Sequence, residues 1–357
     1  MAARFKGGES LPRARQGRRK CEGGKQMSLR IGLIGAGIMG ADHARVFAEE
    51  VPGTALQVIC DADRKRARAA ADSTGALDVT DDPLAVVNSS KVDAVVIAAP
   101  DPFHAPLALA CIAAGKPVLC EKPLSQDVAK CLAVLAAEEK CGRRLVQVGF
   151  MRRFDPSYME IRSLLVRGDL GKALVFHCFH RNVSPAYDFR AEMAICNSAP
   201  HEFDVARWML DSEIRTVSVC RPRAGGDTAP VLMMLETEAG QLVNVEVNIS
   251  ASYGYDVRGE LVGEKGTAVL RAPVHADINL GLKQINTYPA DWRPRFVEAY
   301  ARQNRAWVKS VNTGNPNHGA SAWDGYCSTA VAAAGVEALH SGKPAKVELT
   351  AKPPFYA

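Results

Sequence analysis

A lysine and a histidine in distant parts of the sequence carry the groups that oxidation of a hydroxyl requires. Lys122 stands between Glu121 and a proline, directly after an apolar run. An ammonium group at a strand end can polarise a hydroxyl and lower its pKa. His201 opens the segment HEFDVARW, where a neutral imidazole could accept the hydroxyl proton. Taken singly, Lys122 could be a surface lysine and His201 a structural histidine at a helix start.

A glycine pattern near the beginning of the chain indicates a phosphate site. Gly35, Gly37 and Gly40 form a Gly-x-Gly-x-x-Gly motif directly after the apolar run RIGLI and at the start of an amphipathic segment. The first glycine permits a tight turn, the second lets backbone N–H groups approach a pyrophosphate, and the third allows close packing of helix and strand. The motif therefore predicts a bound dinucleotide.

An acidic residue follows the second predicted strand. Asp61 lies 21 residues beyond Gly40, where a carboxylate can accept hydrogen bonds from the adenosine ribose hydroxyls. Its other interpretation is a turn residue. A carboxylate at this place repels a 2′-phosphate, so the pattern favours NAD over NADP. Arg64 and Lys65 follow closely and leave NADP open.

Two domains must position these groups. Residues 28–150 alternate short apolar runs with helical segments, which is typical of a Rossmann-type doubly wound parallel sheet. The predicted strands are RIGLIG, ALQVIC, DAVVIAA, PVLCE and LVQVGF. Pro100 follows the third of these runs, at a strand end where open α/β sheets bind ligands.

The pattern changes in residues 151–357. An amphipathic segment, a strand (ALVFHCFHRN) and a helix (HEFDVARWMLD) lead into alternating runs that predict an open, mainly antiparallel sheet with helices on one face. Turns are expected at residues 238–240 and 264–266, and long helices at about 292–313 and 324–341. This α+β domain is expected to bind substrate and to form oligomers.

Composition limits the classes of function. The formal charge of the 357-residue chain is +5, but residues 1–27 hold eight basic and two acidic side chains, which leaves 36 basic and 37 acidic elsewhere. The basic character therefore belongs to a tail, predicted to be a disordered extension, and neither a nucleic-acid partner nor a membrane partner is expected. Ten cysteines without a CxxC pair indicate reduced thiols of a cytoplasmic protein, with no metal site.

Several motifs together resemble the Gfo/Idh/MocA oxidoreductases, and most closely the bacterial inositol 2-dehydrogenases. The resemblance covers residues 29–357 and rests on GLIGAGIMGADHARVF, CEKPLS, VQVGFMRRFD, HCFHRN, HEFDVARW, YGYDVRGELVGEKG and SAWDGY. GxGxxG and EKP indicate only the broad family, whereas FMRRFD, YGYD and SAWDGY together point to inositol. The resemblance implies NAD-dependent oxidation of a polyol in inositol catabolism, by a homotetramer built through the open sheet.

The resemblance also implies the site residues. The implied catalytic residues are Lys122, His201 and Asn197. The implied cofactor-binding residues are Gly35, Gly37, Ile38, Met39, Gly40, Asp61, Pro100, Glu121 and Lys122. The implied substrate-binding residues are Met151, Arg152, His180, Asn182, Asn197, Ser198, His201, Tyr253 and Tyr255. Arg152 or its neighbour Arg153 could instead be a salt-bridged surface residue, and the tyrosines could be sheet packing.

Asn197 departs from the family pattern, because inositol dehydrogenases usually have aspartate there. An asparagine can orient His201 but has no charge to favour the protonated ring. The departure is compatible with a slower enzyme, with a different polyol or sugar, or with a helix cap near Ser198. The leading hypothesis is oxidation of myo-inositol to the ketone. The alternatives are an amino-cyclitol or sugar dehydrogenase and a sensor that binds NAD without turnover.

Overall fold

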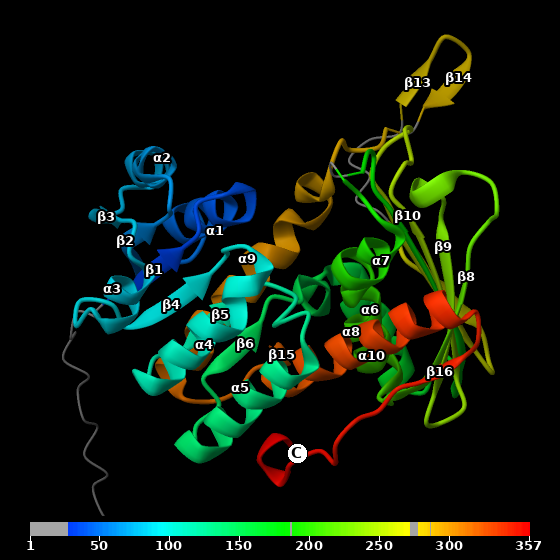
Figure 1. Ribbon diagram of the computed structural model, residues 1–357. Coiled ribbons are helices and arrows are strands. Elements are labelled where there is room, and N and C mark those ends of the chain that lie inside the picture. Colours follow the sequence, from blue (N-terminus) through cyan, green and yellow to red (C-terminus); the bar gives the residue numbers. More distant parts are fainter. Residues whose placement is uncertain (1–27, 186–187, 272–277, 286) are drawn as a thin grey trace, which may run out of the picture.

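The computed structural model describes residues 28–185, 188–271, 278–285 and 287–357, and its two large sheets lie at opposite ends of the molecule (Figure 1). The tail predicted for residues 1–27 lies outside the described residues. The first sheet has the order β15-β6-β5-β4-β1-β2-β3, and β15 alone among these described strands is antiparallel to its neighbour. The strands are β1 (Leu29–Ile34), β2 (Thr54–Cys60), β3 (Asp78–Thr80), β4 (Ala94–Ile97), β5 (Val118–Cys120), β6 (Val146–Val148) and β15 (Ala320–Ser321).

Helices cover both faces of the first sheet, as the alternation of apolar runs predicts. Alternate side chains of β4 enter opposite cores, Val95 one and Val96 the other. The core around Val96 also holds side chains of α1 (Ile38–Glu49), α2 (Arg64–Thr74) and α9 (Trp292–Thr313). The core around Val95 holds side chains of α3 (Pro83–Asn88), α4 (His104–Ala113), α5 (Val128–Cys141) and α10 (Ala322–Ser341). The doubly wound prediction is confirmed.

Short polar residues begin several of the described helices, and glycines end several of them. An aspartate side chain accepts a backbone N–H at the start of α2, α3, α5, α6 (Pro156–Val166) and α9, and so occupies a donor that the helix leaves open. Glycines with positive φ follow α2, α5, α9 and α10, where a side chain would be strained. These local signals explain why most predicted boundaries hold to within a few residues.

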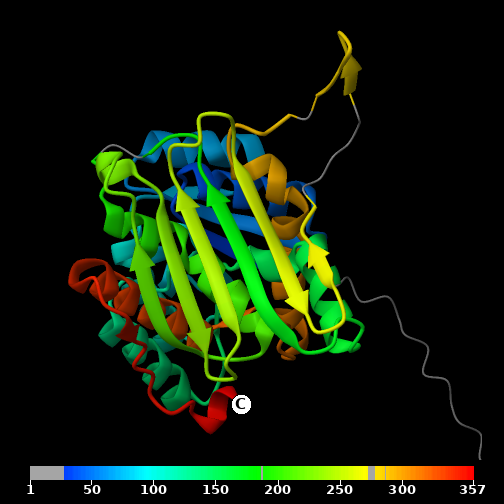
Figure 2. The ribbon, with the colours of Figure 1, turned by 90° about the vertical axis from the view of Figure 1, so that its right-hand side faces the viewer.

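The second sheet has the order β12-β11-β7-β10-β9-β8-β16. Its neighbours are antiparallel except for the parallel pair β7 and β10, which confirms the mainly antiparallel prediction. Figure 2 shows its outer face without a covering helix. The strands are β7 (Ala173–Arg181), β8 (Ile214–Cys220), β9 (Val231–Thr237), β10 (Leu242–Asn248), β11 (Asp256–Gly263), β12 (Thr267–Val269) and β16 (Ala345–Lys346).

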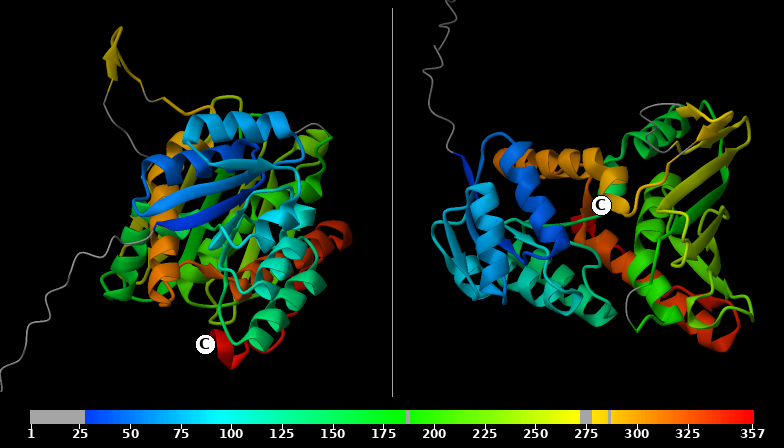
Figure 3. Two further views of the ribbon diagram at one scale, coloured as in Figure 1. Left: turned by 90° about the vertical axis from the view of Figure 1, so that its left-hand side faces the viewer. Right: turned by 90° about the horizontal axis from the view of Figure 1, so that it is seen from above.

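Helical segments cover the inner face of this sheet. They are α6, the π-helical turn η3 (Ala194–Ser198), α8 (Pro200–Leu210) and α10, and the short helix α7 (Ala191–Met193) leads directly into η3. The long helix α9 lies against α1 and against the turn η2 (Met151–Phe154), and it runs between the two sheets in the view from above (Figure 3). The helices α9 and α10 contribute side chains to the cores of both domains and so join them.

Some elements were not predicted. The strands β3 and β15 have three and two residues, and α3 has six, so each is too short for a periodic pattern. The same holds for the hairpin of β13 (Ile278–Leu280) and β14 (Lys283–Ile285) and for the turns η1 (Asp101–Phe103), η4 (Gly226–Thr228) and η5 (Pro354–Tyr356). Among the described helices none has the length and apolarity needed to cross a bilayer.

Candidate active site

The glycine-rich loop between β1 and α1 has the shape of a phosphate cradle. Gly35 has a φ of 97°, and a Cβ atom on it would collide with the backbone of Ala98. A Cβ atom on Gly40 would collide with the carbonyl oxygen of Gly35. Gly37 instead faces open space, with no atom within 4 Å of the position of a Cβ. Gly35 and Gly40 are thus needed for packing, and Gly37 leaves room for a pyrophosphate at the start of α1.

Asp61 is joined to this loop. Its Oδ2 accepts a hydrogen bond of 2.7 Å from the backbone N–H of Ala36, and its Oδ1 accepts one of 2.9 Å from Asp63. Arg66 lies 3.6 Å from the carboxylate, whereas Arg64 pairs with an exposed aspartate. The cation nearest to Asp61 is therefore Arg66, which sequence reasoning did not single out.

The other predicted cofactor residues lie around the same loop. Ile38 is exposed at the start of α1 and Pro100 is exposed after β4. Met39 contacts α9, where its sulfur lies 3.2 Å from the indole nitrogen of Trp292 and 3.9 Å from the hydroxyl oxygen of Tyr300. The loop is thus bordered by α9 as well as by the strand ends of the first sheet.

Glu121 has a different environment from its neighbour Lys122. Its Oε1 lies 2.9 Å from His43 Nε2, its Oε2 accepts the backbone N–H of Lys122 at 3.2 Å, and Asn304 donates to the other nitrogen of His43. Burial alone would raise the pKa of Glu121, but the hydrogen bond from His43 and the electrostatic attraction of His43, Lys122 and His104 together outweigh burial and leave the pKa lowered. Glu121 therefore anchors the Lys122 backbone to α1 and α9, and the cofactor contact expected of it stays a prediction.

The structure brings the two candidate catalytic residues together across the domain boundary. Lys122 Nζ donates a 3.1 Å hydrogen bond to the backbone carbonyl of Asn197, four residues before His201. The Lys122 charge is close enough to contribute to the pKa of His201. Lys122 of the first domain therefore lies next to the segment of the second domain that carries His201, and the catalytic role expected of the two residues stays a prediction.

Asn197 does not act as the cap of α8. It lies in η3, and α8 begins at Pro200 with Ala199 as its N-cap, so the helix-cap interpretation is wrong. Its Oδ1 accepts a 2.9 Å hydrogen bond from Gln126, which also donates to Asp101. Asn197 thus contributes its backbone oxygen to Lys122, while its side chain is engaged at the surface.

His201 is buried at the start of α8. Its ring lies 6.0 Å from that of Phe150 and 6.4 Å from that of His180. Within the described residues its Nδ1 has no hydrogen-bond partner. Burial, with the nearby charges of Arg152 and Lys122, holds the pKa of His201 well below its usual range. The imidazole is therefore neutral at pH 7 and able to accept a proton.

Arg152 and His180 meet at a carboxylate that sequence reasoning missed. Arg152 is 1% exposed and forms an ion pair with Glu202, whose other oxygen lies 3.1 Å from His180 Nδ1. Tyr255 packs against His180 with a ring separation of 6.0 Å. Arg152 is thus a buried residue, which contradicts the surface interpretation. The available signal was the acidic residue directly after His201.

The remaining predicted substrate residues do not all lie near His201. Met151 is buried in the core of the second domain, and Ser198 is half-buried at the end of η3. Asn182 continues β7, where its backbone bonds to Asn248. Tyr253 lies half-exposed, with its hydroxyl bonded to Arg181 and Asp256, and its ring packs on Tyr288. Tyr255 therefore lies beside His180 and near His201, whereas Tyr253 lies outside this cluster.

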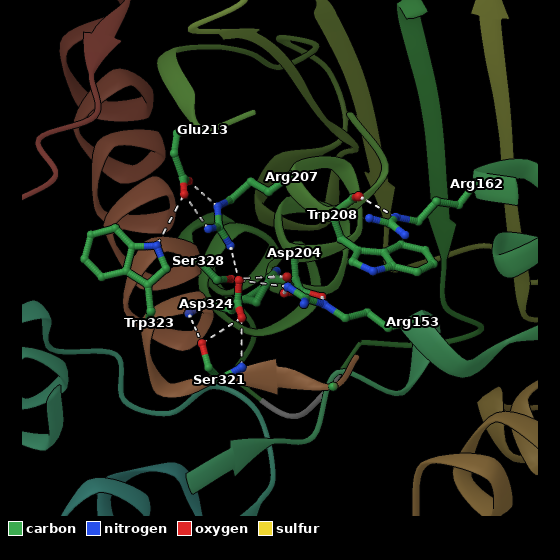
Figure 4. A network of polar contacts seen from close by, with 12 residues as sticks. Arg153, Arg162, Asp204, Arg207, Trp208, Glu213, Ser321, Trp323, Asp324 and Ser328 are labelled. Atoms are coloured by element: carbon green, nitrogen blue, oxygen red, sulfur yellow. Dashed lines mark hydrogen bonds and ion pairs between the residues drawn. The ribbon is translucent and has the colours of Figure 1, made fainter. Parts of the chain in front are cut away.

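A second buried ion network supports α8 (Figure 4). Arg153 is paired with Asp204 at 2.6 Å and with Asp324 at 3.0 Å, and Arg207 bridges Asp324 and Glu213. Two adjacent arginines thus have different partners. Arg152 pairs with Glu202 near His201, while Arg153 joins η2 to α8 and to the start of α10. Arg153 is a salt-bridged residue but a buried one. In the described part of the chain no cluster of three potential metal ligands occurs.

Comparisons with known proteins agree with this geometry. Residues 29–150 match the model described as "Oxidoreductase family, NAD-binding Rossmann fold", and residues 158–269 match "GFO/IDH/MocA C-terminal domain". Inositol 2-dehydrogenase 1 of Saccharopolyspora erythraea is 47% identical over 92% of this chain and 99% of its own length, and inositol 2-dehydrogenase of Klebsiella pneumoniae is 39% identical over the same shares.

A solved structure is similar over the whole fold. Myo-inositol dehydrogenase from Lactobacillus casei, in complex with NAD(H) and myo-inositol, superposes with a TM-score of 0.88 at 28% identity, over 93% of this chain and 100% of that one. Each of the two domains is therefore matched by a family model, and the solved structure matches both together. The chain belongs to the Gfo/Idh/MocA family of oxidoreductases.

Proposed function

We propose that the protein is an NAD-dependent dehydrogenase that oxidises a ring hydroxyl of myo-inositol, or of a close cyclitol, to the ketone. The observation that carries this proposal is the contact between Lys122 and the segment that bears the neutral, buried His201. The relatives named inositol 2-dehydrogenase support the choice of substrate, and the neighbour with bound NAD(H) supports the choice of cofactor.

The residues present fit a dinucleotide. Open space at Gly37 and the first N–H groups of α1 would receive the pyrophosphate, and Asp61 would accept hydrogen bonds from the adenosine ribose. Bound NAD+ supplies a hydride acceptor. The proximity of Arg66 to Asp61 leaves room for some use of NADP, so NAD preference is part of the proposal.

The protein residues handle the proton and the oxygen. The hydroxyl O–H bond breaks as its proton passes to the neutral imidazole of His201, and the hydride leaves the same carbon, which yields the ketone (an inosose when the substrate is myo-inositol). Lys122 donates a hydrogen bond to the reacting oxygen and stabilises its negative character. Burial of His201, Tyr255 and Arg152 keeps water away from this step.

The proposal extends to assembly and location. On the outer face of the second sheet Leu232, Met234 and Leu242 are exposed on adjacent strands, where their cross-strand neighbours are polar. Exposed apolar side chains grouped in this way favour a subunit interface. A homotetramer built through this sheet is therefore proposed. The nine cysteines within the described residues are free thiols, which is compatible with a cytoplasmic protein.

The decisive experiment measures reduced-nicotinamide absorbance with NAD and a panel of inositols, amino-cyclitols and aldoses. We expect turnover with myo-inositol. Preference for an amino-cyclitol or an aldose would replace the substrate assignment. Silence with every compound, despite NAD binding, would replace the enzyme with a sensor.

Two substitutions test the assigned roles. Lys122→Met and His201→Ala are each expected to lower kcat by about 10²- to 10⁴-fold, while NAD binding persists. Lys346→Met and His340→Ala, at exposed positions that contact neither Lys122 nor His201, serve as controls with normal rates. A variant of Lys122 or His201 with near-normal turnover would remove that residue from the mechanism.

A third substitution tests the departure at position 197. Asn197→Asp places a carboxylate four residues before His201, and we expect higher activity on myo-inositol because a negative charge favours the protonated imidazole. The measurement is kcat/KM for myo-inositol. Unchanged or lower activity would refute the interpretation of this chain as a slower relative.

A further inference from the structure

Glu202 is a buried carboxylate that directly follows His201 in the chain. It is fully buried, its Oε1 forms an ion pair with Arg152, and its Oε2 lies 3.1 Å from His180 Nδ1. Arg152 comes from η2, His180 from β7 and Glu202 from α8, so the carboxylate joins three elements around His201. Nothing in the mechanism proposed above uses this residue.

The charges around His201 are mostly positive. Arg152 and Lys122 both oppose protonation of its ring. Arg295 of α9 is neutralised by Asp155 at 2.6 Å, and the other titratable groups that face Glu202 and Arg152 are the weak acids Tyr158, Cys178 and Tyr255. Burial raises the pKa of all three, so they stay neutral at pH 7.

The residue four positions before His201 adds no negative charge. Asn197 is neutral, and its Oδ1 is engaged by Gln126. A proton taken up by His201 would thus form a third cation beside Lys122 and Arg152, unless a nearby carboxylate neutralises one of them. Glu202 is the carboxylate that pairs with Arg152 and neutralises its charge.

We propose that Glu202 is a positioning residue for the dehydrogenase reaction, whose carboxylate neutralises Arg152 and orients His180 so that His201 can take up the substrate proton. The inference rests on the proposed function, because it assigns His201 as the base. A carboxylate at His180 Nδ1 accepts the N–H there and leaves Nε2 as a hydrogen-bond acceptor. Such an acceptor suits a hydroxyl of a polyol that lies between the two imidazoles.

Three variants separate this role from simple support of the fold. Glu202→Gln leaves Arg152 without its counter-charge, so the acid limb of the kcat/KM profile should move down by about one pH unit and the plateau should fall at least about 10-fold. Arg152→Met leaves the carboxylate without its cation, and the acid limb should move up. The double variant removes both charges and should return the limb to its wild-type position.

Asp204→Asn is the matched control. Asp204 lies two residues further along α8 and is also a buried carboxylate paired with an arginine, but it faces the Arg153 network rather than His201. It should lower stability without moving the acid limb. If Glu202→Gln does not fold, Arg152→Met and the double variant still test the inference, because the double variant leaves no unpaired buried charge.

A second measurement needs no turnover. Histidine-labelled NMR of the protein without substrate follows the protonation of the His201 ring directly, with His201→Gln used for assignment. We expect the ring to titrate at higher pH in Arg152→Met than in Glu202→Gln. That order, with silence in the substrate panel, would keep the electrostatic inference and remove the enzyme proposal. An equal titration of His201 in both variants would overturn the inference even if turnover is normal.

Discussion

The open position at Gly37 allows a substitution that separates cofactor binding from folding. Gly37 has a φ of −67°, a value that alanine adopts without strain, and no atom lies within 4 Å of the position of a Cβ. Gly37→Ala should therefore keep the free energy of unfolding or raise it by about 0.4–1 kcal/mol, because alanine restricts the unfolded chain.

The same methyl group would occupy the space proposed for the pyrophosphate. Displacement of a phosphate from one backbone N–H costs about 1.5–3 kcal/mol, the value of a hydrogen bond to a charged group. At 1.4 kcal/mol for each factor of ten, NAD should bind about 10- to 100-fold more weakly.

Gly40→Ala is the contrasting variant. Its Cβ would collide with the carbonyl oxygen of Gly35, and because backbone cannot move aside as a side chain can, we expect a loss of about 2 kcal/mol in stability. Urea unfolding measures the stability of both variants, and calorimetric titration measures NAD binding. Wild-type NAD affinity in a well-folded Gly37→Ala protein would refute the placement of the pyrophosphate at the start of α1.

Three further predictions concern charge, pH and assembly. Asp324→Asn should lower the free energy of unfolding by about 3 kcal/mol, because Arg153 and Arg207 lose a buried partner. The control Glu348→Gln, in an exposed pair, should cost under about 0.5 kcal/mol. Equal losses for the two variants in urea unfolding would contradict this difference between buried and exposed pairs. Burial would raise the pKa of Glu202, but the ion pair with Arg152 and the hydrogen bond from His180 outweigh it and hold the pKa at about 2, against an ordinary 4.5. Between these two values the unfolded chain binds more protons than the folded one. About 3 kcal/mol of stability should therefore disappear as pH falls from about 5 to 2. Urea midpoints measured across this range should fall less steeply for Glu202→Gln than for the wild type. Met234→Glu on the outer sheet face should dissociate the assembly in light scattering, whereas Val166→Glu, also at an exposed position, should not; an unchanged mass for Met234→Glu would exclude this face as the interface.

Much of this architecture could be read from local patterns. Strands with both faces buried, such as β4, consist of continuous apolar residues. Several helices carry their own start and stop residues, so both sheets and most helices were predicted. Gly35, Gly37 and Gly40 sit where a strand meets a helix because the motif and its flanks are contiguous in the chain. Lys122 and His201 were recognised by their motifs, and parallel strands bring their carboxyl ends to one edge of a sheet.

The pairing of distant side chains could not be read in this way. Arg152, His180 and Glu202 are separated by 28 and 22 residues along the chain, and nothing local to any of them indicates that they share one buried charge cluster. Glu121 and Lys122 are adjacent in sequence, yet one carboxylate is bound to His43 while the ammonium reaches the second domain. Residues two apart share a face in a regular strand, but Tyr253 and Tyr255 precede β11, and Gly254 between them has a φ of 143°, so their different surroundings could not be read from the spacing. Residue types and their spacing along the chain determined which side chains are candidates for the chemistry. Only the packing of the two domains determined which of these side chains meet, because ion pairs between distant residues leave no periodic pattern in a sequence.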